Sequence, residues 1–140
     1  MLALDVKTPS QPIPADPHYM ILPIDQGFDW AASFEGIAAG DWYLVVFRSK
    51  HRAGANEALL TDLDNAASES ARELSGFLHY FIGTPLASGE CLSFCLWNSR
   101  EEAAFASAQP AHREAVMKGI AHYEDYALER YAVRKWEGVV

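Results

Sequence analysis

The sequence predicts an α+β domain in which four antiparallel strands form one sheet and two helices pack on one face of it. The main observation is the order of patterns from residue 41 onward, which is strand, helix, strand, strand, helix, strand. The strand-like segments are rich in β-branched and aromatic residues, and the helix-like segments repeat apolar residues every three or four positions. The chain has 140 residues, of which 50% are hydrophobic and 21% are charged, so it suits a single globular domain. We therefore expect residues 41–140 to form the domain and residues 1–40 to form an N-terminal extension.

The extension is rich in proline. Five of the seven prolines of the chain lie within its first 23 residues, which favours an extended backbone there. His18–Ile24 is predicted to be a short edge strand, because Pro23 would be unfavourable in a central strand. Phe28–Ala39 is predicted to be a short helix that ends at Gly40.

The first half of the domain contains a strand followed by a long helix. Trp42–Phe47, with the sequence WYLVVF, is typical of a buried strand. Asn56–Ser75 carries apolar residues at helical spacing, and its polar residues fall on the opposite side. Gly76 is predicted to end this helix, because glycine readily adopts the left-handed conformation of a helix C-cap.

Two further strands are predicted to form a hairpin. They are Phe77–Gly83 and Cys91–Trp97, and the segment TPLASGE between them contains the turn residues proline, serine and glycine. Ser99 and Glu102 then form the pattern of a capping box, which predicts a helix over Arg100–Ala108.

A second helical piece is predicted to begin at Pro110, and its apolar stripe includes His112, Val116, Ile120 and Tyr123. Ala127–Trp136 is predicted to be the last strand, with a continuing helix as the alternative interpretation. The complete order is that of a split βαβ, or ferredoxin-like, arrangement.

Charge and cysteine usage limit the partners and the compartment. The net charge of −8 argues against nucleic acid and against an anionic membrane surface as partners. Cys91 and Cys95 lie four residues apart on one predicted strand, so their Cα atoms should be about 13 Å apart, too far for a disulfide. Two reduced thiols, and an N-terminus without the pattern of a secretory signal, predict a cytoplasmic protein.

The predicted sheet carries no charge on either face of its hairpin strands. Cys91, Ser93, Cys95 and Trp97 alternate with three apolar residues, and Phe77, His79 and Phe81 alternate with Leu78, Tyr80 and Ile82. Two helices can cover only one face, and an exposed apolar sheet face is unfavourable. We therefore expect a second copy of the chain to pack on the other face as a homodimer. The alternative is that residues 1–40 cover this face and leave a monomer.

Two histidines are the candidate catalytic residues. His79 lies within an apolar strand, where it would share a face with Ser93, Cys95 and Trp97 if the hairpin register has the right parity. His112 lies on the apolar stripe of a helix. Either imidazole could act as a general base near neutral pH, and either could instead be a hydrogen-bonded core residue.

A flat apolar pocket between sheet and helices is also predicted. Trp97, Phe77 and Phe81 offer area for stacking a planar aromatic ligand, with Ser93, Cys95 and Val116 beside them. His112 and His122 lie about 15 Å apart along a helix, too far to share a metal ion, and no HExxH or CxxC pattern is present. We therefore expect no metal site.

Residues 41–137 resemble the dimeric α/β-barrel superfamily, and in particular its antibiotic biosynthesis monooxygenase and heme-degrading monooxygenase branch. The resemblance rests on the element order and on CLSFCLWNSREEAAFASAQPAHREAV, where a strand ends in Trp-Asn-Ser and a helix and a histidine follow. GFLHYFIG and YEDYALERY also resemble stretches of uncharacterised bacterial proteins. The resemblance implies a homodimer with a ligand pocket between sheet and helices. Heme-degrading members carry an Asn on the first strand, and Asp41–Arg52 contains none.

Three functions follow as hypotheses. The first is a small oxygenase that needs no tightly held cofactor and acts on a planar aromatic substrate, with His79 or His112 as the base. The second is a non-enzymatic binding or stress-associated dimer that uses the same pocket as a receptor. The third is heme binding with His112 as the axial ligand.

Overall fold

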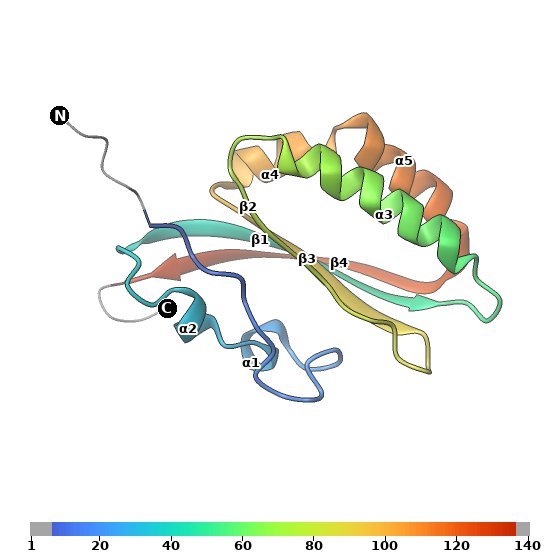
Figure 1. Ribbon diagram of the computed structural model, residues 1–140, viewed down its shortest axis with the longest axis horizontal. Coiled ribbons are helices and arrows are strands. Elements are labelled where there is room, and N and C mark those ends of the chain that lie inside the picture. The colour runs from blue at the N-terminus through green and yellow to red at the C-terminus, as the bar shows by residue number, and fades with distance from the viewer. Residues whose placement is uncertain (1–6, 137–140) are drawn as a thin grey trace.

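The fold is built on one antiparallel sheet with helices on one side and the N-terminal segment on the other. The computed structural model describes residues 7–136. Its sheet has the strand order β2-β3-β1-β4, and neighbouring strands are antiparallel throughout. Figure 1 shows three helices above the sheet and the N-terminal segment below it. This is the predicted ferredoxin-like fold.

The elements of the domain lie close to the ranges that the sequence predicts. Their bounds are β1 Gly40–His51, α3 Glu57–Arg72, β2 Phe77–Ile82, β3 Glu90–Trp97, α4 Arg100–Ser107, α5 Pro110–Gly119, a short 3₁₀ helix Ile120–His122 and β4 Tyr123–Lys135. The strand β4 confirms the prediction that the segment after α5 forms a strand and not a continuing helix. No helix within residues 7–136 is long and apolar enough to span a membrane.

The helix ends follow the local chemistry of the sequence. The side chain of Asn56 accepts a hydrogen bond from the Leu59 amide at the start of α3. The hydroxyl of Ser99 accepts from the Glu102 amide and donates to the Glu102 carboxylate at 3.0 Å, so the predicted capping pair forms at α4. The helix α3 ends at Arg72 with Glu73 as its C-cap, so Gly76 is not the cap that was predicted. Gly76 instead lies in the turn before β2, where it has the expected left-handed conformation with a φ of 85°.

The N-terminal segment differs from the prediction. His18–Ile24 forms turns that lead into the short helix α1, Ile24–Gly27, and no strand forms there. Pro23 is the N-cap of α1, and a proline cannot supply the amide that strand pairing requires. The helix expected over Phe28–Ala39 is reduced to one turn, α2 Trp30–Ser33, because Phe28 instead pairs with Pro14 in an isolated bridge.

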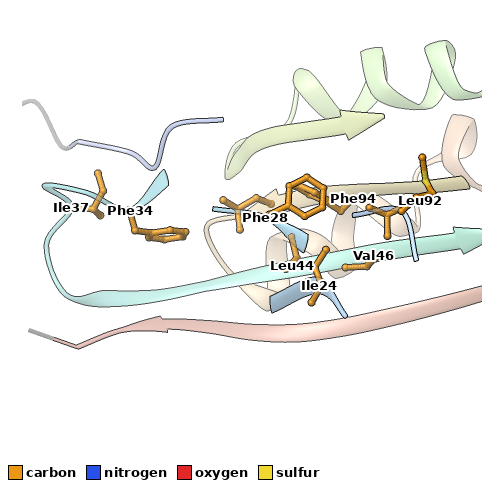
Figure 2. Close-up of a cluster of buried hydrophobic side chains, with 10 residues drawn as sticks. Ile24, Phe28, Phe34, Ile37, Leu44, Val46, Leu92 and Phe94 are labelled. Carbon is orange, nitrogen blue, oxygen red and sulfur yellow. The ribbon is translucent and has the colours of Figure 1, made fainter. Parts of the chain in front are cut away.

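Residues 9–37, which we call the cover segment, bury the second face of the sheet. The core between them contains Met20, Ile24, Phe28, Phe34 and Ile37 of the cover segment and Leu44, Val46, Leu92, Phe94 and Leu96 of the sheet. Figure 2 shows side chains of this core, with Phe28 of the cover segment next to Phe94 of the sheet. Five sheet residues on this face, from β1 and β3, are at most 2% exposed, so the central part of the face is shielded from water. Tyr131 of β4 pairs with Leu44 on the same face and is 38% exposed.

Polar side chains of the sheet also hold the cover segment. The guanidinium of Arg48 donates to the carbonyl oxygens of Met20 and Leu22 and to the carboxylate of Glu129, at 3.2, 2.7 and 2.9 Å. Lys135 donates to the carbonyl oxygen of Phe34 at 2.6 Å, and His79 is hydrogen-bonded to the carbonyl oxygen of Pro9. These bonds fix the cover segment at several points along its length.

The cover segment changes the expected assembly. A second copy of the chain was expected on this face because the helices cover only the other face and an exposed apolar sheet face is unfavourable. The alternative cover, the N-terminal residues of the same chain, is the one that the structure shows. The cover segment occupies the central part of this face, so a second copy would contact the cover segment or the exposed part of β4, and the homodimer stays a prediction.

Candidate functional site

A cavity of about 470 Å³ lies between the helix-covered face of the sheet and α3, α4 and α5. Its floor is formed by residues of β1 and β3 that pair with one another across the sheet. Tyr43 and Trp97 pair at one end, Val45 pairs with Cys95 next to them, Phe47 pairs with Ser93, and Ser49 pairs with Cys91. The volume lies within the roughly 300–1,000 Å³ typical of small-molecule sites.

The end of the cavity near α4 is aromatic and apolar. Trp97 is 3% exposed, and its ring meets the ring of Phe77 edge to face, with the centroids 5.6 Å apart. Ala103 and Ala106 of α4 pack in one cluster with the indole and close this end of the cavity. This end is therefore apolar and aromatic, which suits contacts with a planar ligand.

The opposite end carries polar groups. His51 ends β1, its side chain is 10% exposed, and its Nδ1 lies 2.9 Å from both carboxylate oxygens of Glu57. The His51 ring also packs on Tyr123, with the centroids 5.3 Å apart, and Tyr123 packs on Tyr126 at 5.5 Å. Asp64, one turn after the buried Leu60 on α3, also lines the cavity.

Burial controls the ionisation of the lining groups. It raises the pKa of the Asp64 carboxyl, and the charge of nearby His51 acts in the opposite direction. Burial and the charge of Asp64 together raise the pKa of Tyr126 to about 12, and they also raise the pKa of Tyr80 and of Tyr123. These tyrosines therefore stay neutral at physiological pH.

His112 is the sequence-predicted histidine that reaches the cavity. It projects from α5 and its ring lies 6.3 Å from the ring of Phe47, measured between centroids. Burial lowers the pKa of His112, and a backbone hydrogen bond at Ser107 partly offsets this effect. The imidazole is therefore neutral at pH 7, which is the form that accepts a proton.

The structure brings together five of the eight residues that the sequence suggested for the site. Trp97, Ser93, Cys95, Val116 and His112 all line the cavity. Phe77 lies behind Trp97 and packs against its ring, outside the lining.

His79 and Phe81 lie away from the cavity, contrary to the expectation. The pairing of β2 with β3 shifts between Phe77 and His79, so His79 pairs with Leu96 and not with Cys95 or Trp97. The irregularity turns Phe81 toward the cover segment, where it stacks on Phe94 with the centroids 5.2 Å apart. His79 holds Pro9 of the same segment, so the structure favours its alternative interpretation as a hydrogen-bonded packing residue.

Sequence reasoning missed Asp64 and His51. The polar residues of this helix, Asp64 among them, were expected on the side opposite to the apolar stripe. Asp64 lies four residues after Leu60 and three before Ala67, and so on the stripe that faces the sheet. His51 continues the alternation of Tyr43, Val45 and Phe47 along β1, which runs beyond the predicted end of that strand. Both signals were present in the residue spacing.

Among residues 7–136, no group of three or more His, Cys, Asp or Glu side chains is placed to hold a metal ion. His122 is occupied at the start of α3, where its Nδ1 accepts a hydrogen bond from the Asn56 amide at 3.2 Å. The cavity is thus a mixed apolar and hydrogen-bonding site.

The sequence pattern of the PB2B2.08-like family matches residues 10–140 of the chain. The chain belongs to this family. A curated relative, UPF0643 protein PB2B2.08 of the yeast Schizosaccharomyces pombe, is 27% identical over 154 residues, which cover 98% of this chain and 68% of the relative. The expected grouping with bacterial proteins stays a prediction, since this relative is a yeast protein.

Solved structures share the fold at low sequence identity. SnoaB, a cofactor-independent oxygenase from Streptomyces nogalater, is 13% identical with a TM-score of 0.55, covering 70% of this chain and 97% of SnoaB. A protein from Nitrosomonas europaea named after antibiotic biosynthesis monooxygenases is 9% identical, with a TM-score of 0.58 and coverages of 71% and 94%. A dimeric ferredoxin-like protein from Thermobifida fusca is 12% identical, with a TM-score of 0.56 and coverages of 67% and 92%. These similarities establish the ferredoxin-like fold.

The buried thiols make stability depend on pH. Burial raises the pKa of Cys95 to about 12 and that of Cys91 to about 11, compared with about 8.5 for an unfolded thiol. The thiols are protonated in both states below pH 8. Above that, only the unfolded chain loses its thiol protons, so stability falls until the pH passes the folded pKa values. We expect the free energy of unfolding to drop by about 2 kcal/mol through Cys95 alone between pH 8 and pH 10.

Urea unfolding at a series of pH values measures this effect. Cys95→Ala should show a smaller decrease between pH 8 and pH 10 than the unmodified chain. Equal decreases in the two proteins would contradict the assignment of the effect to this thiol.

Proposed function

We propose that the cavity binds a planar aromatic small molecule and that the protein acts on it as a cofactor-independent oxygenase. The cavity between sheet and helices, with an aromatic wall at Trp97 and a volume of about 470 Å³, is the observation that carries the proposal. The fold shared with SnoaB, which is described as a cofactor-independent oxygenase, supports the reaction class. The two unpaired thiols agree with the proposed cytoplasmic location.

His112 is the proposed general base. Its neutral imidazole takes the proton of a ligand hydroxyl, so an N–H bond forms, the O–H bond breaks and the electron pair stays on the phenolate oxygen. The phenolate then reduces dioxygen. For 1-naphthol, C₁₀H₈O and O₂ give 1,4-naphthoquinone, C₁₀H₆O₂, and H₂O, so that one oxygen atom enters the ring and the other leaves as water. The apolar wall limits access of water to this reaction.

Binding is tested with two neighbouring alanines of α3. Ala67 lines the cavity and Ala66 is exposed on the other side of the helix. Ala67→Trp should fill the cavity and weaken the binding of 1-naphthol at least tenfold, as measured by calorimetry, whereas Ala66→Trp should bind like the unmodified chain. Binding that is unaffected by Ala67→Trp would contradict the proposed site.

Turnover distinguishes an enzyme from a receptor. We expect oxygen uptake and quinone absorbance to rise together with 1-naphthol or larger hydroxylated arenes, and we expect His112→Ala to abolish both. Binding without oxygen uptake for every ligand would favour the receptor function. A saturable hemin titration that is lost in His112→Ala would instead favour the heme-binding function.

A further inference from the structure

The cavity contains one carboxylate that no protein group satisfies. Among the described residues, the Asp64 side chain takes part in no hydrogen bond or salt bridge, although it is only partly exposed and lines the cavity. The other lining carboxylate, Glu57, is held by His51. No Asp64 oxygen is fully buried without a partner, so water can reach this carboxylate. A ligand that supplies a positive charge there would replace water with a stronger, charge-assisted hydrogen bond.

The surroundings of Asp64 favour a cation. Tyr123 and Tyr126 line the cavity from β4, and Tyr80 lines it from β2 at the other edge of the sheet. The charge of Asp64 raises the pKa of all three tyrosines. The negative field of the carboxylate therefore extends over their rings. Phenol rings attract cations through their faces, which adds to the attraction of the carboxylate. His51 acts on Asp64 in the direction that lowers the pKa of its carboxyl, and the Nδ1 of His51 is already hydrogen-bonded to Glu57.

The distance along α3 connects this group to the aromatic wall. Ala71 packs against the cluster that contains Trp97 and lies seven residues after Asp64 on the same helix. At 1.5 Å per residue the two positions are about 10 Å apart. A bicyclic ring with a two-carbon chain can therefore contact the wall at Trp97 and reach the carboxylate with its terminal group.

We propose that the ligand of this cavity carries a protonated amine, which binds the Asp64 carboxylate while its aromatic ring lies toward Trp97. This inference rests on the proposed function, because it specifies the chemical class of the molecule that the cavity binds. It assigns to Asp64 a ligand-binding role that depends on charge.

Three matched probes test the inference by calorimetry on the full chain at pH 7. They are 2-(1-naphthyl)ethylamine, which is a cation, 2-(1-naphthyl)ethanol, which is neutral, and 1-naphthylacetate, which is an anion. The unmodified protein should bind the amine at least tenfold more tightly than the alcohol, and the anion most weakly. Asp64→Asn should remove the preference for the amine and keep the affinity for the alcohol.

Asp62→Asn is the control, because Asp62 lies on the same helix, carries the same charge and is exposed outside the cavity. This variant should keep the preference of the unmodified chain. Equal affinities for amine and alcohol in the unmodified protein, or tightest binding of the anion, would overturn the inference and leave the aromatic site intact. A preference for the amine that persists in Asp64→Asn would also overturn it. Failure of all three probes to bind would instead count against the proposed function.

Discussion

Phe28→Ala should destabilise the protein by about 3–5 kcal/mol, as large-to-small changes of buried aromatic residues do. Phe28 is 4% exposed, and its ring meets those of Phe81 and Phe94 edge to face, with centroid distances of 4.9 and 5.0 Å. Tyr19 packs against the same ring at 5.5 Å. The substitution would leave a cavity between the cover segment and the sheet that these neighbours could fill only in part.

Urea unfolding measures the effect, and Ile21→Ala is the matched control within the cover segment. Ile21 is 58% exposed, so its loss should change the free energy of unfolding by no more than about 0.5 kcal/mol. Similar small effects of the two substitutions would show that the cover segment is not part of the cooperative unit. The sheet face would then need another cover, and a second copy of the chain would again be the expected one.

Gly76→Ala should cost about 2–3 kcal/mol through two separate effects. The φ of 85° disfavours any residue with a Cβ atom by about 1–2 kcal/mol. A Cβ atom at this position would also lie 1.7 Å from a carboxylate oxygen of Glu102, so this side chain would have to move and give up its hydrogen bond from Ser99. Loss of that capping interaction adds about 1 kcal/mol.

Gly54→Ala separates the two effects. Gly54 has a φ of 77° and open space around its position, so alanine there should show the backbone cost alone. In a Glu102→Ala background, Gly76→Ala should cost about as much as Gly54→Ala does. Equal losses of unfolding free energy for Gly76→Ala and Gly54→Ala with Glu102 present would show that the contact with Glu102 does not add to the cost of Gly76→Ala.

The predicted fold follows from local patterns that the structure keeps. The capping pair of Ser99 and Glu102, the left-handed Gly76 and the apolar stripe of α3 each specify an element without help from distant residues. The cover segment lacks such signals, since its two helices are one turn each and its position depends on contacts with the sheet. Tertiary packing, which single-residue propensities do not describe, therefore determines its shape.

The candidate site was predictable in part for the same reason. Alternation along β3 correctly placed Ser93, Cys95 and Trp97 on the cavity floor. On β2 the pairing with β3 shifts by one residue between Phe77 and His79. A shift of one residue places the side chains that follow on the other face of the sheet, so His79 and Phe81 face the cover segment instead of the cavity. Asp64 was missed because a carboxylate on a helix was assigned to solvent before its position on the apolar stripe was considered.

The cover segment also distinguishes this chain from its neighbours in fold. The family match includes residues 10–37 of the cover segment. The three solved structures cover between 67% and 71% of the chain while using at least 92% of their own length, so about three tenths of this chain has no counterpart in them. We therefore expect the unmodified chain to keep its sheet face occupied by its own residues. The cavity lies on the opposite face and does not depend on a second copy for its walls.

The central claim is that this cavity is the ligand site, and amide chemical shifts measured during a titration with 2-(1-naphthyl)ethylamine test it most directly. The account predicts saturable shifts at lining residues of β1, β3 and α3, including Trp97 and Asp64, with little change at Phe28 and Phe34 of the cover segment. Saturable shifts centred on the cover segment, or no saturable shifts at the lining residues, would contradict it.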